Sequence, residues 1–119
     1  MIGECKSVSF SPDGTRIITG SNKLALIWDV KTGAQLNTLK AHSSSISSVS
    51  FSSDGTMIVT GSWDKLAIIW DAKTSTTLGN PLTGHSLGIT SVSFSPDCTR
   101  VVTGSSDKLA IIWDIKTCA

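Results

Sequence analysis

Three copies of one sequence unit, spaced 41 to 43 residues apart, constrain the fold of this chain more than any other feature. Residues 42–74 align with residues 85–117 without a gap and share 24 of 33 positions. A more divergent copy precedes them, with S-V-S-F-S-P-D-G-T at residues 7–15 and L-A-L-I-W-D-V-K-T at residues 24–32. Self-similarity at this period indicates a repeat architecture, in which each unit buries its apolar faces against its neighbours.

Each unit has the pattern of a small antiparallel sheet. In residues 46–52 apolar side chains alternate with serine, which predicts a half-buried strand. A tight turn follows, in which Gly55 is expected to supply a positive φ. Residues 57–60 and 66–70 predict two further strands, and the more polar residues 76–82 predict a weak outer strand. Because residues 66–70 are apolar throughout, both faces of that strand must be covered by neighbouring sheets.

These residues resemble the WD40 repeat family over essentially the whole chain. The landmarks are an Ala-His or Gly-His start, S-P-D-G in the first hairpin, G-S-x-D in the second, and a closing Trp-Asp pair. The resemblance implies an all-β fold, a β-propeller whose four-stranded blades are arranged radially about a channel. It also implies that repeat and blade are offset, because the outer strand of one blade precedes the His of the next repeat.

The whole chain is interpreted as one WD40 region, with repeats at residues 1–41, 42–84 and 85–119. The first is degenerate, and the last lacks its outer strand. Blade 1 is then expected at about residues 7–39 and blade 2 at about residues 45–82, with an incomplete blade 3. Known propellers close with about four to eight blades, so three blades leave two apolar faces open. Two interpretations stand: a homo-oligomer (dimer or trimer) that closes the ring, or a slice of a longer array.

Both histidines of the chain occupy the same position of the repeat. In the WD40 family this His joins a hydrogen-bonded set with a Ser or Thr of the second strand, the turn Asp and the Trp. Carried over by position, the resemblance implies two structural sets: His42, Thr60, Asp64 and Trp70, and His85, Thr103, Asp107 and Trp113. In the first repeat Met1 and Asn22 occupy the His and Asp positions, so we expect that unit to fold without the set.

A His–Asp–Ser/Thr arrangement is also the beginning of a hydrolase triad. The duplicated context and the lack of a nucleophile-elbow sequence favour the structural interpretation, so we expect no catalytic residue. Three cysteines without a C-x-x-C pair predict neither a metal site nor a disulfide framework, and no cofactor motif is present. Cys98 replaces a hairpin glycine, where divergence is favoured over a reactive thiol. Cys5 and Cys118 are interpreted as thiols rather than as a pair across protomers.

Charge and hydropathy narrow the class of partner. The net charge of +1, from ten basic and nine acidic residues, gives no large positive field, so no nucleic-acid partner is expected. Apolar runs stop at five or six residues, too few to cross a bilayer, and the first residues contain no signal-peptide core. The sequence therefore predicts a soluble, cytoplasmic protein without a membrane partner.

The resemblance implies a non-catalytic protein–protein interaction scaffold. The alternative is the WD40 sensor segment of a larger nucleotide-binding signalling or immune-type receptor. In the family, the loops entering the first strand and the hairpin between the second and third strands share the usual docking face. Here the predicted partner-binding face comprises Ser45, Ser47, Trp63, Gly88, Thr90 and Ser106. Trp63 stands out because its counterparts are small serines, although its ring could instead only cover neighbouring loop atoms or Lys65.

Overall fold

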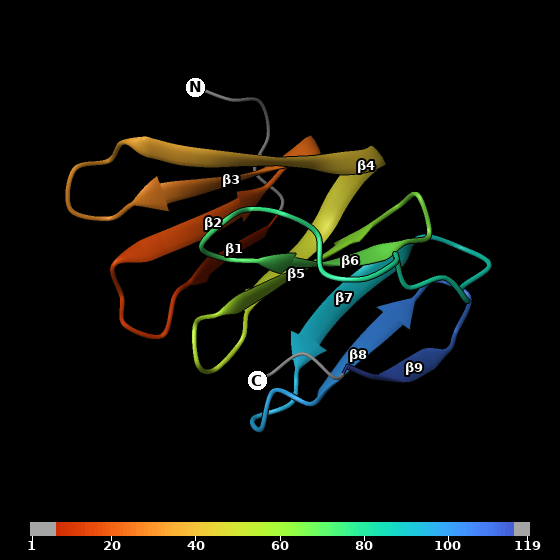
Figure 1. The fold of residues 1–119 in the computed structure, drawn as a ribbon. Coiled ribbons are helices and arrows are strands. Elements are labelled where there is room, and N and C mark those ends of the chain that lie inside the picture. The colour runs from red at the N-terminus through yellow and green to blue at the C-terminus, as the bar shows by residue number, and fades with distance from the viewer. Residues whose placement is uncertain (1–6, 116–119) are drawn as a thin grey trace.

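The computed structural model describes residues 7–115 as nine β-strands, without an α-helix in that range (Figure 1). The strands are β1 (Ser7–Phe10), β2 (Arg16–Gly20), β3 (Asn22–Asp29), β4 (Gln35–Phe51), β5 (Met57–Ser62), β6 (Ala67–Asp71), β7 (Ile89–Phe94), β8 (Arg100–Ser105) and β9 (Ala110–Asp114). They form a six-stranded sheet in the order β1 to β6 and a three-stranded sheet in the order β7 to β9. Every pair is antiparallel, so the expected all-β fold is confirmed.

Strand β4 belongs to two blades. Its residues 35–40 pair with β3, whereas its residues 46–51 pair with β5. Figure 1 shows β4 turning sharply between these two parts. Blade 1 therefore consists of β1, β2, β3 and the first part of β4, and blade 2 begins with the second part of β4 and continues through β5 and β6. Blade 3 consists of β7, β8 and β9, so residues 7–115 form part of a propeller that is not closed.

The weak outer strand predicted for residues 76–82 does not form as a regular strand. Two isolated bridges, from Thr77 to Trp70 and from Leu82 to Ala67, hold this segment against β6. Between the bridges lies Pro81, which has no N–H to donate to a ladder. An outer element therefore lies where it was predicted, but the prediction that it pairs as a regular strand was wrong.

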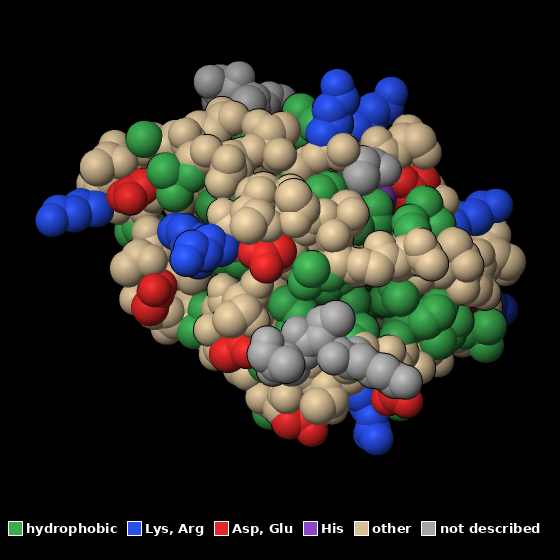
Figure 2. Space-filling model, in the orientation of Figure 1, with side chains coloured by type: hydrophobic (Ala, Val, Ile, Leu, Met, Phe, Trp, Pro, Cys, Tyr) green, Lys and Arg blue, Asp and Glu red, His purple; other side chains and the backbone are tan. Residues whose placement is uncertain are grey.

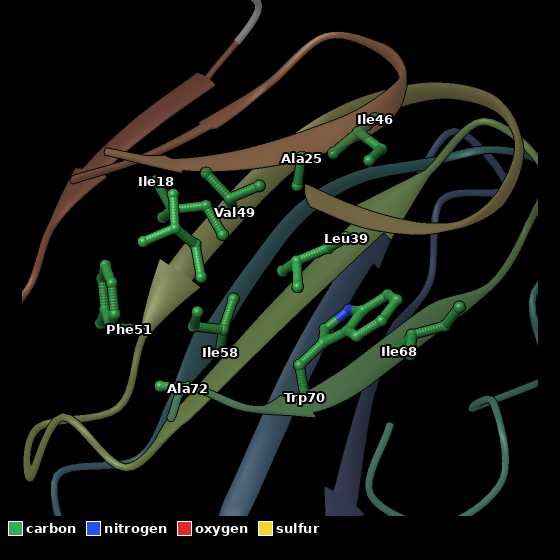
Figure 3. Packing of buried hydrophobic residues seen from close by; sticks show 11 residues of the cluster. Ile18, Ala25, Leu39, Ile46, Val49, Phe51, Ile58, Ile68, Trp70 and Ala72 are labelled. Atoms are coloured by element: carbon green, nitrogen blue, oxygen red, sulfur yellow. The ribbon is translucent and has the colours of Figure 1, made fainter. Parts of the chain in front are cut away.

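The hydrophobic core lies between the blades rather than within them. Between blades 1 and 2, Ile18 and Leu39 lie in one buried cluster with Phe51 and Trp70 (Figure 3). A second cluster between blades 2 and 3 contains Met57, Val59, Ala67, Ile69, Ile89, Val92, Cys98 and Val101. All six residues of β5 are buried because blade 2 has a neighbour on both faces. In β9 every second residue is exposed, because one face of blade 3 has no neighbouring blade among the described residues.

The first hairpin of each blade is closed by the same polar turn. In blade 2, the Ser52 hydroxyl donates to Asp54 Oδ1 at 2.7 Å, and Asp54 Oδ1 also accepts the backbone N–H two residues later. Gly55 has a φ of +75°, as expected. Cys98 takes this position in blade 3 with a φ of +62°, a region that L residues adopt at a cost of about 1 kcal/mol. Its buried thiol lies 3.2 Å from Ser53 Oγ of blade 2.

Candidate functional site

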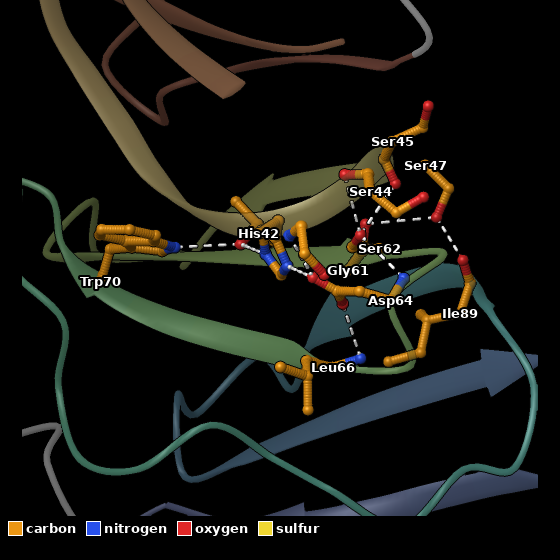
Figure 4. A network of polar contacts seen from close by, with 12 residues as sticks. His42, Ser44, Ser45, Ser47, Gly61, Ser62, Asp64, Leu66, Trp70 and Ile89 are labelled. Atoms are coloured by element: carbon orange, nitrogen blue, oxygen red, sulfur yellow. Dashed lines mark hydrogen bonds and ion pairs between the residues drawn. The ribbon is translucent and has the colours of Figure 1, made fainter. Parts of the chain in front are cut away.

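A buried polar network connects β6, β5 and β4 with the hairpin between β5 and β6 (Figure 4). The Trp70 indole Nε1 donates to Thr60 Oγ1 at 3.0 Å. Thr60 Oγ1 lies 2.7 Å from His42 Nε2, and His42 Nδ1 lies 2.9 Å from Asp64 Oδ2. The structure thus brings together all four residues of the first predicted set, on β4, β5, β6 and the hairpin between β5 and β6.

The chemistry of these groups fixes the direction of each hydrogen bond. An ionised carboxylate only accepts, so His42 Nδ1 carries the proton and donates to Asp64. When the ring is neutral, Nε2 is an acceptor, to which the Thr60 hydroxyl donates while the Thr60 oxygen accepts the indole N–H of Trp70. Every polar atom of the chain from indole to carboxylate therefore has a partner, as buried polar networks require.

Two opposing effects act on the pKa of Asp64. Burial raises it, but hydrogen bonds from the Ser43 N–H, the His42 ring and the Leu66 N–H stabilise the carboxylate and together outweigh burial. The pKa of Asp64 is therefore lowered from its ordinary value, and the carboxylate is ionised at neutral pH. The ionised form is the one that orients the histidine.

Blade 3 contains a second copy of this network. His85 Nε2 lies 2.7 Å from Thr103 Oγ1, His85 Nδ1 lies 2.9 Å from Asp107 Oδ2, and Trp113 Nε1 donates to Thr103 Oγ1 at 2.9 Å. The pKa of Asp107 is also lowered, because hydrogen bonds from His85 and two backbone N–H groups outweigh the effect of burial. The second predicted set is thus assembled with nearly the same distances as the first.

Among the residues that the structure describes, blade 1 retains only the indole end of the network. Trp28 Nε1 donates to Thr19 Oγ1 at 3.0 Å. Asn22, at the Asp position, instead accepts a hydrogen bond from the Ser45 hydroxyl of β4 at 3.0 Å. Met1, at the His position, lies outside the described residues.

A hydroxyl, an imidazole and a carboxylate in this order have the connectivity of a hydrolase triad, but the environment differs from that of an active site. Thr60 is fully buried, and its oxygen already accepts the indole N–H. A nucleophile must be reachable by substrate and have an oxyanion site beside it. Within residues 7–115 there is likewise no group of His, Cys, Asp or Glu side chains arranged to hold a metal ion. The geometry is suited to holding the blade together.

Of the six residues predicted for the partner-binding face, four lie together on one loop surface. Trp63 is exposed over 52% of its surface, and its backbone N–H donates to Ser45 O at 2.9 Å. A Cβ added to Gly88 would lie 3.0 Å from Trp63 Cα, so the loop entering β7 passes directly against this tryptophan. The N–H of Ser106 donates to Gly88 O at 3.2 Å, which places these four residues in one continuous loop surface.

The other two predicted residues contact the sheets instead. The half-buried Ser47 hydroxyl contacts Gly61 O and, across the blade boundary, Ile89 O. Thr90 is exposed, and its hydroxyl donates to Gly104 O at 3.3 Å. Ser47 is therefore occupied by a contact between blades, whereas Thr90 lies at the edge of the loop surface.

Sequence analysis missed the serines that join one blade to the next. The Val49 N–H donates to Ser7 Oγ, and the Val92 N–H donates to Ser48 Oγ, each at 3.2 Å. Both hydrogen bonds run from the inner strand of one blade to the inner strand of the previous blade. The signal was a serine directly before the valine of each S-V-S-F motif, but its partner depends on how the blades pack.

Charged side chains of both signs are interspersed over the face shown in Figure 2, and hydrophobic side chains gather near the boundary of blades 2 and 3. A cleft of about 190 Å³ lies at this boundary, lined by residues that include Ile69, Leu82 and Ile115. Among residues 7–115 there is no helix long and apolar enough to cross a membrane.

Comparison with known proteins agrees with the geometry. Residues 3–29, 33–71 and 76–114 each match the family described as "WD domain, G-beta repeat". The fold is similar to that of a solved structure of U3-55K, with a TM-score of 0.88 and 24% sequence identity over 93% of this chain. At this identity the likeness concerns the fold, and this chain spans 36% of the length of that one. With three matched segments that cover most of its length, the chain belongs to the WD40 repeat family.

Proposed function

We propose that the chain is a non-catalytic protein-interaction scaffold that binds a protein partner through the loop surface formed by Ser45, Trp63, Gly88 and Ser106. The observation that carries this proposal is the exposure of Trp63 on a hairpin that a backbone hydrogen bond to Ser45 O fixes to the neighbouring strand. Tryptophan is costly to leave in water and is enriched among the residues that dominate binding energy at interfaces. A rigid support reduces the ordering cost of binding.

Three further observations support a scaffold over other classes of protein. The hydroxyls of Thr60 and Thr103 are buried and hydrogen-bonded, which leaves no nucleophile for a substrate in either network. The net charge of +1 gives little attraction for a nucleic acid or an anionic membrane. WD40 repeats generally mediate protein–protein contacts, and we expect this one to do so in the cytoplasm.

The test is Trp63→Ser, which copies the residue found at the same place in blade 3. Because Trp63 is half exposed, we expect the melting temperature to change little. Affinity for a protein partner isolated with the wild-type chain should fall about thirtyfold, equivalent to about 2 kcal/mol, as measured by isothermal titration calorimetry.

The matched control is Leu36→Ser, which removes another exposed apolar side chain from the outer part of β4. It should leave the affinity unchanged. An unaltered affinity for Trp63→Ser, with an intact fold, would exclude Trp63 from the binding surface.

A further inference from the structure

Blades 1 and 3 lie on either side of blade 2 (Figure 1), so within residues 7–115 each has one face without a neighbouring blade. The open face of blade 3, here the C-terminal face, exposes Val102 and Ile112. Ile112 is 69% exposed, whereas its counterpart Ile69 in blade 2 is 4% exposed. Side chains that a neighbouring blade buries in blade 2 are thus left in solvent in blade 3.

The open face of blade 1, here the N-terminal face, shows the complementary pattern. It exposes Val8 and Phe10 of β1. Phe10 is 64% exposed, whereas Phe51, at the same position of blade 2, is 7% exposed because it packs against blade 1. The two open faces therefore correspond to the two sides of an interface that the chain already forms twice.

A glycine on the C-terminal face gives the sharpest evidence of this correspondence. A Cβ added to Gly61 would lie 2.6 Å from Val92 Cγ1 and 2.7 Å from Ile89 Cγ2, so only glycine allows blade 3 to approach. Gly20 is required in the same way at the boundary of blades 1 and 2. Gly104 occupies this position in blade 3, yet a Cβ there would meet nothing within 4 Å.

The same face also carries a serine that corresponds to the hydrogen-bond acceptors between the inner strands of consecutive blades. Ser48 Oγ accepts the Val92 N–H from the following blade, and Ser7 Oγ accepts the Val49 N–H. Ser91 is the corresponding residue of blade 3 and is exposed, with no such donor among the described residues. The C-terminal face thus presents the acceptor that the inner strand of a further blade would use.

The C-terminal face also carries an arginine that corresponds to one in contact with the next blade. Arg16 of blade 1 donates through Nη1 to Ala72 O of blade 2 at 3.2 Å and lies over the Phe51 ring, 5.6 Å from its centroid. Arg100 is the counterpart in blade 3, where it borders an apolar groove of about 360 Å³. Its guanidinium forms an exposed ion pair with Asp114 at 3.1 Å, an arrangement that contributes little to stability.

We propose that the C-terminal face of one chain binds the N-terminal face of a second copy and re-forms the contact between consecutive blades. Gly104 then lies against Val8 of the second copy. The backbone N–H of that Val8 donates to Ser91 Oγ. Arg100 turns from Asp114 to the ring of Phe10 of the second copy. Two copies of residues 7–115 supply six blades, within the range of about four to eight that closes a ring, whereas three copies supply nine. The proposed assembly is a closed, head-to-tail dimer with two identical interfaces.

The first experiment measures the mass of the full chain by light scattering. We expect a single species of twice the 12.5 kDa of one chain. Gly104→Val should leave the individual chain folded, since the position is open and its φ is not left-handed, but it should clash with the second copy. The dissociation constant should rise at least about a hundredfold, because the closed ring contains two such clashes. Ala34→Val, in the exposed turn between β3 and β4, is the control and should leave the dimer intact.

The second experiment separates a head-to-tail contact from every other dimer. Phe10→Asp places a charge on the N-terminal face, at a position that is largely exposed in the single chain. Gly104→Val and Phe10→Asp should each be monomeric alone, with unchanged circular dichroism. Mixed in equal amounts they should form a weaker dimer, because one unaltered face from each variant can still make one interface.

The mass measurements would overturn the proposal if the wild-type chain were monomeric or polydisperse, or if Gly104→Val did not weaken the dimer. A monomer or a polydisperse chain would indicate that the faces are covered by further blades of a longer polypeptide. A failure of the two monomeric variants to combine would equally exclude the head-to-tail contact. The binding test on Trp63 is independent of all these outcomes, because that residue lies outside both faces.

Discussion

Replacing Thr60 by valine tests whether the network from Trp70 to Asp64 stabilises blade 2. Valine has nearly the same shape as threonine, so the substitution leaves no cavity and removes only the hydroxyl. That hydroxyl serves two buried groups, the indole N–H at 3.0 Å and the acceptor nitrogen of His42 at 2.7 Å. A buried polar group left unpaired costs about 1–3 kcal/mol, so Thr60→Val should lower the free energy of unfolding by about 2–6 kcal/mol.

The same chain supplies the matched control. Thr19 of blade 1 accepts the Trp28 indole N–H at 3.0 Å, but both residues are only half-buried and blade 1 has no histidine among the described residues. Thr19→Val leaves one group unpaired, and water can reach it. We expect that substitution to cost less than about 1.5 kcal/mol.

The assay is urea unfolding followed by circular dichroism, with both variants and the wild type at one protein concentration, because association would change the apparent stability. Shifts of the midpoint at constant slope give the change in free energy. Equal losses for Thr60→Val and Thr19→Val would refute the reasoning, since they would show that the histidine end of the network contributes nothing.

Two further predictions concern packing and pH. Gly61→Ala should destabilise the chain by about 1–3 kcal/mol in thermal unfolding, because the added Cβ collides with blade 3, whereas Gly104→Ala should have little effect on the single chain. Hydrogen bonds from the Thr56 N–H and the Ser52 hydroxyl lower the pKa of Asp54 from 3.8 to about 2. Its contribution to stability is therefore complete above about pH 4 and disappears as the pH falls toward 2, and a melting temperature unchanged over that range would contradict this. Asp13 and Asp97 occupy the same place in the turns of blades 1 and 3, and their pKa values are also lowered to about 2.

Local sequence patterns predicted those parts of the fold that local chemistry determines. The alternation in residues 46–52 and the apolar run of residues 66–70 correspond to the second part of β4 and to β6. The positive φ at Gly55 follows from the turn itself. The failure at residues 76–82 has a local cause too, because Pro81 prevents a continuous ladder and only two bridges form.

The contacts between blades could not be predicted from the sequence of one unit. Gly61 matched the WD40 pattern, but the reason that only glycine fits there is the close approach of Val92 of the next blade. The Ser48 hydroxyl likewise pairs with a residue 44 positions away. The residues of the His42 network came from family resemblance, and their directions of donation required the distances. Residues that depend on tertiary packing carry no signal in their immediate neighbours.

The boundary between blades 1 and 2 is built differently from the boundary between blades 2 and 3. Blades 1 and 2 share one strand of 17 residues, which pairs with β3 in blade 1 and with β5 in blade 2. Blades 2 and 3 are connected through residues 72–88, where two isolated bridges replace a ladder. The position of blade 3 against blade 2 therefore depends on contacts that cross the boundary, namely a buried apolar cluster and the hydrogen bond from the Val92 N–H to Ser48 Oγ. A substitution at this boundary acts on side-chain packing, whereas one in β4 also acts on a strand that belongs to two blades.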